Sequence, residues 1–264
     1  ELLARCAEDE GFAIETAFRI RDREGKIVDF TRNRAQKFLD KQPGPSRIVL
    51  KSRKVGVSSR IIAGDLWACA FRAHEHAILI CQNADEARKQ YEERVKPMLN
   101  LCLVPLGGIP RADHVWFPAT QSRYYTGAAG AKKFGRGSDI TRWHLSEIAW
   151  WDKPDIMTGI EEARVGEWVG RLESTANGFN HFRQSWMRAN EGLGLYRPVF
   201  IPWWLDDLCR IPGARLPGLG EDEEKLVEAF GLDHEQLAWR RQKIASMARP
   251  ELFPQEFPST PQEA

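Results

Sequence analysis

A short loop between a strand pattern and a helix pattern constrains the fold of this chain more than any other feature. Residues 51–59 read KSRKVGVSS, after a buried-strand pattern over 47–50 and before a helical pattern over 59–71. A strand, a tight loop and a helix in this order favour phosphate binding, because the loop amides and the helix N-terminus both attract anions. On the loop alone, a basic turn without a ligand is the alternative interpretation.

The loop matches the phosphate-binding frame G-x-x-x-x-G-K-[ST], the Walker A frame, with one displacement. Gly56 and Ser58 take the places of the second glycine and the magnesium-binding hydroxyl, whereas Val57 occupies the lysine position and Lys51 that of the first glycine. The phosphate-neutralising charge is therefore expected from another basic residue of the loop: Lys51, Arg53 or Lys54. We expect the whole loop to contact the nucleotide: Lys51, Ser52, Arg53, Lys54, Val55, Gly56, Val57, Ser58 and Ser59.

A second apolar run, 140–145, ends in Ser146-Glu147, where P-loop ATPases carry the acidic pair of the Walker B strand. We expect Glu147 to orient and deprotonate the water that attacks the γ-phosphate; the alternative is a solvated carboxylate at a strand end. Ser146 replaces the aspartate and coordinates only weakly. Mg²⁺ is therefore expected on Ser58, the phosphates and water, with Ser146 acting through water. Glu161 and Glu173 are the next candidates for the catalytic acid.

A third strand pattern ends in a turn of small polar residues, Ser174-Thr175-Ala-Asn177-Gly178. Between residues 47 and 204, apolar runs alternate with helical patterns, which predicts a mainly parallel sheet flanked by helices. The carboxyl ends of parallel strands meet at one edge of such a sheet, where ligands of open α/β folds bind. The loop, the acidic strand and the polar turn are therefore expected to lie together.

In this order the motifs resemble the N-terminal ATPase domain of the large terminase subunits of tailed bacteriophages, whose lambda-like and Mu-like members also carry the lysine at the front of the loop. Asp29-Phe-Thr-Arg-Asn-Arg-Ala-Gln36 is similar to the adenine-recognising segment of that family, and 173–178 to its coupling motif. Residues 199–204 and 253–264 are similar to its following strand and to the end of its ATPase half.

The resemblance implies a P-loop NTPase fold of the RecA-like class, with ATP and Mg²⁺ as cofactors. It also implies adenine recognition by Gln36, coupling of hydrolysis to DNA through Ser174, Thr175 and Asn177, and an arginine, Arg136, that reaches the γ-phosphate of a neighbouring subunit. A loop arginine on solvent or DNA is the alternative for Arg136.

The function that the resemblance implies is translocation of double-stranded DNA into a procapsid by a homo-oligomeric ring. The implied partners are DNA, the portal protein and the small terminase subunit, in the host cytoplasm and transiently on the procapsid. The net charge of +1 predicts a mostly monomeric isolated domain, and no apolar run approaches a membrane span. The family's nuclease would follow Ala264, so we expect a piece of a longer protein that does not cut DNA.

We predict three regions: an adenine-binding adapter over 1–46, a P-loop core over 47–204 and a lid or linker subdomain over 205–264. The adapter is expected to hold a helix and two short strands about a turn at Glu24-Gly25, and Trp203 and Trp204 are expected within a strand. Two alternatives in function remain. One is a helicase-like P-loop ATPase, and the other is a nucleotide-binding domain that does not hydrolyse ATP.

Overall fold

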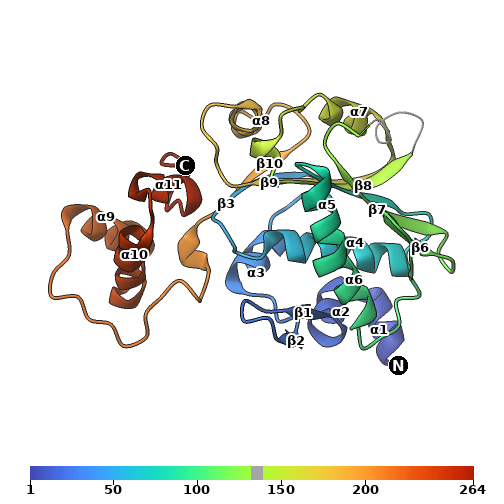
Figure 1. The fold of residues 1–264 in the computed structure, drawn as a ribbon, viewed down its shortest axis with the longest axis horizontal. Coiled ribbons are helices and arrows are strands. Elements are labelled where there is room, and N and C mark those ends of the chain that lie inside the picture. Colours follow the sequence, from blue (N-terminus) through green and yellow to red (C-terminus); the bar gives the residue numbers. More distant parts are fainter. Residues whose placement is uncertain (132–138) are drawn as a thin grey trace.

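The computed structural model describes residues 1–131 and 139–264, and its centre is an eight-stranded sheet of order β10-β3-β9-β8-β4-β7-β6-β5 (Figure 1). Its strands are β3 (Arg47–Lys51), β4 (His76–Cys81), β5 (Ile109–Pro110), β6 (His114–Phe117), β7 (Ser122–Ala128), β8 (Ile140–Ser146), β9 (Arg164–Ser174) and β10 (Arg197–Ile201). Neighbours from β10 to β7 are parallel, and β7, β6 and β5 are antiparallel. The predicted mainly parallel α/β sheet is confirmed.

Helices cover both faces of this sheet (Figure 1). One face carries α4 (Val57–Phe71), α5 (Ala84–Gln90) and α6 (Lys96–Asn100), and the other carries α7 (Ile156–Glu162) and α8 (His181–Asn190). The helix expected over 59–71 is therefore present and begins two residues earlier. A π-helical turn, Tyr91–Val95, joins α5 to α6.

The N-terminal segment packs on the outer side of α4. It comprises α1 (Leu2–Glu8), α2 (Glu10–Ala17), the hairpin β1 (Arg19–Arg21) and β2 (Ile27–Asp29), and α3 (Arg34–Asp40). The expected turn at Glu24-Gly25 is confirmed, with Gly25 at a φ of 84° that favours glycine. Ile14 and Phe30 share one hydrophobic cluster with Trp67 of α4, so apolar burial fixes this segment to the core.

The two faces of the central strands differ in chemistry. Trp143 and Leu145 of β8 pack in the cluster beneath α7 and α8, whereas Arg142, His144 and Ser146 alternate with them and face α4. All three polar residues are buried. Buried polar groups need partners, and the neighbouring strand β9 and helix α4 supply them.

The C-terminal segment forms a small separate cluster of α9 (Glu221–Phe230), α10 (His234–Ser246) and α11 (Phe253–Glu256), at the left of Figure 1. Its centre contains Trp203, which stacks on Trp239 at 5.1 Å. The expectation that Trp203 and Trp204 lie within a strand is wrong. β10 ends at Ile201, because Pro202 cannot donate to the sheet, and a 3₁₀ turn, Trp203–Leu205, follows.

Candidate functional site

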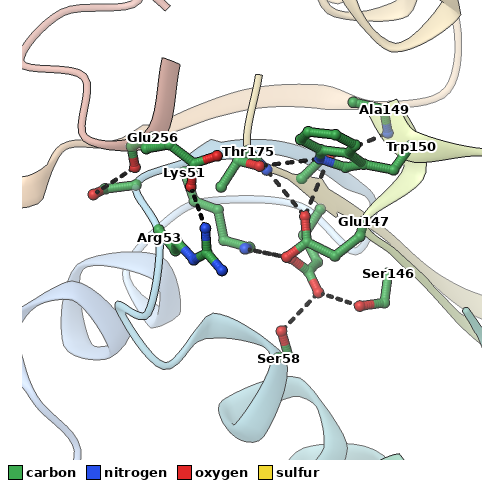
Figure 2. Close-up of polar contacts among 12 residues, drawn as sticks. Lys51, Arg53, Ser58, Ser146, Glu147, Ala149, Trp150, Thr175 and Glu256 are labelled. Atoms are coloured by element: carbon green, nitrogen blue, oxygen red, sulfur yellow. Dashed lines mark hydrogen bonds and ion pairs between the residues drawn. The ribbon is translucent and has the colours of Figure 1, made fainter. Parts of the chain in front are cut away.

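The carboxyl ends of β3, β9 and β8 lie side by side at one edge of the sheet, because these three parallel strands are neighbours in that order. They end at Lys51, Ser174 and Ser146, and the loop 52–56 leads from the first of them into α4. The expectation that the loop, the acidic strand and the polar turn meet at one edge is thereby confirmed (Figure 2).

Backbone geometry shapes the loop for an anion. Lys54 and Gly56 have φ angles of 63° and 81°, in the left-handed region. Any other residue would be strained at the φ of Gly56, and its Cβ would also lie 2.7 Å from Nε2 of Gln36, which would then have to shift. The first N–H groups of α4 have no acceptor within the helix, and its dipole attracts negative charge.

The N-terminal segment holds the loop by three successive carbonyls. Arg23 donates to the carbonyl of Lys54 at 2.8 Å, Asn33 to that of Val55 at 3.2 Å, and Gln36 to that of Gly56 at 2.8 Å. A trans peptide points its N–H away from its C=O. The N–H groups of residues 55–57 therefore point away from the N-terminal segment, which leaves them available to phosphate oxygens.

Both the donor and the acceptor of the Gln36 side-chain amide have hydrogen-bond partners within the protein. It donates to Gly56 and accepts from the Asn33 N–H at 2.9 Å, in a capping box that begins α3. The residue is buried. The structure thus places Gln36 against the loop, and adenine recognition by it stays a prediction.

Lys51 is buried between two carboxylates. Its Nζ lies 2.7 Å from Oε1 of Glu147 and 3.2 Å from Oε2 of Glu173. Burial alone would lower the pKa of the ammonium, but the charges of Glu147 and then Glu173 outweigh it and raise that pKa above its ordinary value. The lysine at the front of the loop is therefore charged and lies at the centre of the site.

The residues of the loop after Lys51 differ in their burial and in their contacts. Arg53 is exposed and forms an ion pair with Glu256 of α11 at 2.9 Å. Ser52 is buried and donates its N–H to the Ile201 carbonyl. The side chains of Val55 and Val57 are buried in a cluster with α3, so these two residues offer only their backbone to a ligand. Ser59 lies half-buried on the first turn of α4.

Glu147 follows β8 in the left-handed region, with a φ of 52°. Its side chain is 39% exposed and therefore partly buried. One carboxylate oxygen accepts from Lys51, and the other accepts from the Thr175 N–H at 3.3 Å and the Ser174 hydroxyl at 3.4 Å. Figure 2 shows the carboxylate of Glu147 directed toward Thr175 of the polar turn.

A second carboxylate lies deeper in the site. Oε1 of Glu173 accepts from the hydroxyls of Ser58 and Ser146, each at 2.7 Å, and lies 3.2 Å from Nε2 of His144. Burial opposes ionisation, but the charge of Lys51 and the hydrogen bonds from His144 and Ser146 keep the pKa of Glu173 well below its ordinary range. Glu161, the other alternative acid, instead accepts from the Tyr196 hydroxyl at 2.7 Å, beneath the opposite face of the sheet.

Residues of the polar turn form hydrogen bonds with the segment that follows Glu147. Ser174 accepts from the Ala149 N–H at 3.1 Å, Thr175 from the Trp150 indole at 3.2 Å, and Asn177 donates to the Ala149 carbonyl at 3.1 Å. The predicted coupling residues therefore contact both Glu147 and the 3₁₀ turn that follows it, Ile148–Trp150.

A cavity of about 300 Å³ opens beside Glu147. Its lining comes from the loop, the ends of β4, β8 and β9, and helices α5 and α11: Arg53, Cys81, Gln82, Glu86, Gln90, Ser146, Glu147, Trp150, Thr175 and Glu256. The predicted arginine, Arg136, lies outside the described residues.

The donor set suits magnesium held together with a nucleotide. Ser58 and the buried carboxylate beside it are oxygen donors, which Mg²⁺ prefers. Within 1–131 and 139–264, no three or more His, Cys, Asp or Glu residues gather into a metal-binding group. Phosphate oxygens and water would therefore complete the shell. In the same described ranges, no helix is long and apolar enough to cross a membrane.

No protein-family model matches this sequence, and neither does any curated protein. Solved structures are similar in fold. The HK97 bacteriophage large terminase aligns with a TM-score of 0.64 and 16% identity over 95% of this chain and 54% of that chain. The large terminase of a thermophilic bacteriophage aligns with a TM-score of 0.51 and 13% identity over 83% of this chain and 50% of that chain.

The present chain thus spans about half the length of these two terminases. A shorter structure, the large terminase ATPase domain of Thermus phage P74-26, has a TM-score of 0.52 and 13% identity, with 84% of this chain and 91% of that chain covered. Together with the sheet order and the loop, these similarities show that the chain has the P-loop fold of phage large terminase ATPase domains.

Proposed function

We propose that this chain is the ATPase motor domain of a phage DNA-packaging terminase, which hydrolyses ATP to move double-stranded DNA into a procapsid. The observation that carries the proposal is the direct contact of Glu147 with Ser174 and Thr175, beside a loop shaped for phosphates. This contact supports Glu147 as the base and the polar turn as the coupling segment, and Lys51 at the start of the loop contacts the same carboxylate.

The phosphates of ATP would bind the amides of residues 55–57 and the N-terminus of α4, with charge from Lys51 and Arg53. The large terminase of the thermophilic bacteriophage has also been solved in complex with ADP, in a structure that aligns at a TM-score of 0.50, which supports a nucleotide as the ligand. Magnesium, held by Ser58 and the phosphates, would supply charge neutralisation at the γ-phosphate.

Hydrolysis needs a base at the attacking water. Glu147 would accept one proton from that water while the water oxygen forms a bond to the γ-phosphorus. The bond between the γ-phosphorus and the oxygen that bridges it to the β-phosphate would break, which gives ADP and phosphate. Lys51 contacts the same carboxylate at 2.7 Å. A γ-phosphate near Lys51 would compete for its ammonium and so free the Glu147 oxygen to act as the base.

Coupling would follow from the same contacts. Release of phosphate would change the position of Glu147 relative to Ser174 and Thr175, and Asn177 donates to the Ala149 carbonyl in the segment that follows Glu147. The polar turn therefore is suited to carry a displacement from the reacting atoms to a part that grips DNA. The remaining partners of the proposal are the portal protein, the small terminase subunit and further copies of this chain in a ring, in the host cytoplasm and on the procapsid.

Turnover of ATP by the purified protein tests the proposal. Glu147→Gln keeps the shape of the side chain and removes the base, so it should bind ATP like the parent and lose about 10²–10⁴-fold in turnover. Glu167→Gln, an exposed glutamate of β9, is the matched control and should behave like the parent.

Nucleotide binding without turnover in the parent protein would instead support the non-hydrolysing alternative. Unchanged turnover in Glu147→Gln would move the base elsewhere. ATP-dependent separation of DNA strands would favour the helicase-like alternative.

A further inference from the structure

We infer that Glu173 replaces the missing aspartate of the acidic pair and positions the magnesium-binding hydroxyl of Ser58. The inference rests on the proposed function, because it concerns the metal that accompanies ATP. The carboxylate that supports the magnesium site then comes from β9, whereas the sequence pattern places it at the end of β8.

Strand register brings the carboxylate to that position. Ser146 of β8 and Glu173 of β9 are register partners in a parallel pair, so their side chains lie on the same face of the sheet. Both face α4, whose first turn carries Ser58. One carboxylate oxygen of Glu173 accepts from the hydroxyls of both serines at 2.7 Å. A carboxylate from β9 thus lies within one hydrogen bond of position 146.

The bond from Ser58 has a chemical consequence. A hydroxyl has one hydrogen and two lone pairs. Because the hydrogen of Ser58 is donated to Glu173, its lone pairs are turned away from that carboxylate and remain available to a cation. Glu173 is therefore a positioning residue for Ser58, and its negative charge adds to the attraction for the cation.

An ion pair with Lys51 is the competing explanation for this buried carboxylate. The two oxygens of Glu173 separate the roles, however. Oε2 lies 3.2 Å from Lys51, whereas Oε1 contacts Ser58 and Ser146. A carboxylate that served only Lys51 would not need its other oxygen at the metal-binding hydroxyl.

The test measures Mn²⁺ binding to the protein–ADP complex by electron paramagnetic resonance, without turnover. Glu173→Gln should weaken Mn²⁺ affinity by about 10–100-fold, as loss of an outer partner of a metal ligand does. Its affinity for ADP in EDTA should change much less. Glu167→Gln, on the same strand, should leave both affinities at parental values, and Glu147→Gln should keep Mn²⁺ affinity while losing turnover.

A rescue variant separates positioning from folding. Glu173→Gln/Ser146→Asp returns a carboxylate to the usual position of the acidic pair and should recover most of the lost Mn²⁺ affinity. If Glu173→Gln fails to fold, Glu173→Asp keeps the charge beside Lys51 but is one methylene shorter, so it should also lose Mn²⁺ affinity, by less than Glu173→Gln because the charge remains.

The outcomes distinguish the inference from the proposed function. If the parent protein binds ADP and Mn²⁺, and a folded Glu173→Gln or Glu173→Asp protein keeps parental Mn²⁺ affinity, the inference is wrong and Glu173 serves only Lys51. If the parent protein binds ADP neither with Mn²⁺ nor in EDTA, the proposed function itself is wrong, and the inference falls with it.

Discussion

Lys51 and Glu173 form a buried ion pair whose two halves depend on each other. Neither side chain is more than 6% exposed, and an isolated charge at such a depth is costly. Val57, in the usual lysine position, is buried beside Leu39 and Ile61, where an ammonium would have no water. This burial gives a physical reason for a lysine at the front of the loop.

Removing the lysine should therefore cost stability as well as binding. Lys51→Met leaves Glu173 charged and buried, and we expect a loss of about 3–5 kcal/mol in the free energy of unfolding. Thermal and urea unfolding measure it. Lys51→Met/Glu173→Gln should recover part of the loss, because no uncompensated charge remains. If the double variant is no more stable than Lys51→Met, the two side chains are not energetically coupled.

The sequence supports some of these residue roles better than others. Gly56, Ser58 and Glu147 follow from local patterns, since each is recognised by spacing from its own strand end. The place of Glu173 beside Ser58 depends on pairing between β8 and β9, which no local pattern specifies. The one signal in the sequence is the alternation Arg171, Glu173 on β9 against Arg142, His144, Ser146 on β8.

At the scale of elements, the phosphate loop is supported by the N-terminal segment. Arg23, Asn33 and Gln36 come from the loop of the β1–β2 hairpin and from the start of α3, and they hold consecutive carbonyls of the loop. The alternation of apolar runs predicted the strands and helices of the core, because their periodicity is local. It did not predict this support, which joins residues 20 or more positions apart.

The position of Gln36 makes a prediction about nucleotide choice. If it acts by holding the loop, Gln36→Ala should weaken ATP and GTP to the same extent, by about 5-fold for the loss of one hydrogen bond of about 1 kcal/mol. Competition between labelled nucleotides measures both affinities. Gln42→Ala, whose side chain bonds the Phe38 carbonyl at the end of α3, is the control. Selective loss of ATP would instead show adenine recognition.

At the scale of the whole molecule, the C-terminal cluster is tied to the loop. Arg53 donates its N–H to the carbonyl of Glu256 at 2.8 Å and pairs with its carboxylate at 2.9 Å. Phosphates would compete with Glu256 for the same guanidinium. We therefore expect nucleotide binding to weaken the contact between Arg53 and α11.

In the ring that we propose, each ATP would lie between subunits, and Arg136 is the arginine that we expect to complete a neighbour's site. Such an arginine contributes about 10³–10⁵ in rate in other nucleotide hydrolases. Arg136→Ala and Glu147→Gln proteins should each be nearly inactive, and the isolated parent domain should gain specific activity as its concentration rises.

Mixing the two variants tests sharing between subunits. A site formed by the base of an Arg136→Ala subunit and the arginine of a Glu147→Gln neighbour is intact, and random assembly of equal amounts makes about a quarter of the sites of this kind. ATP turnover should then recover toward that fraction of parental activity, with assembly followed by light scattering. A mixture that assembles yet stays as inactive as its components would mean that Arg136 does not act on a neighbour, and contact with DNA would then account better for an arginine between two glycines.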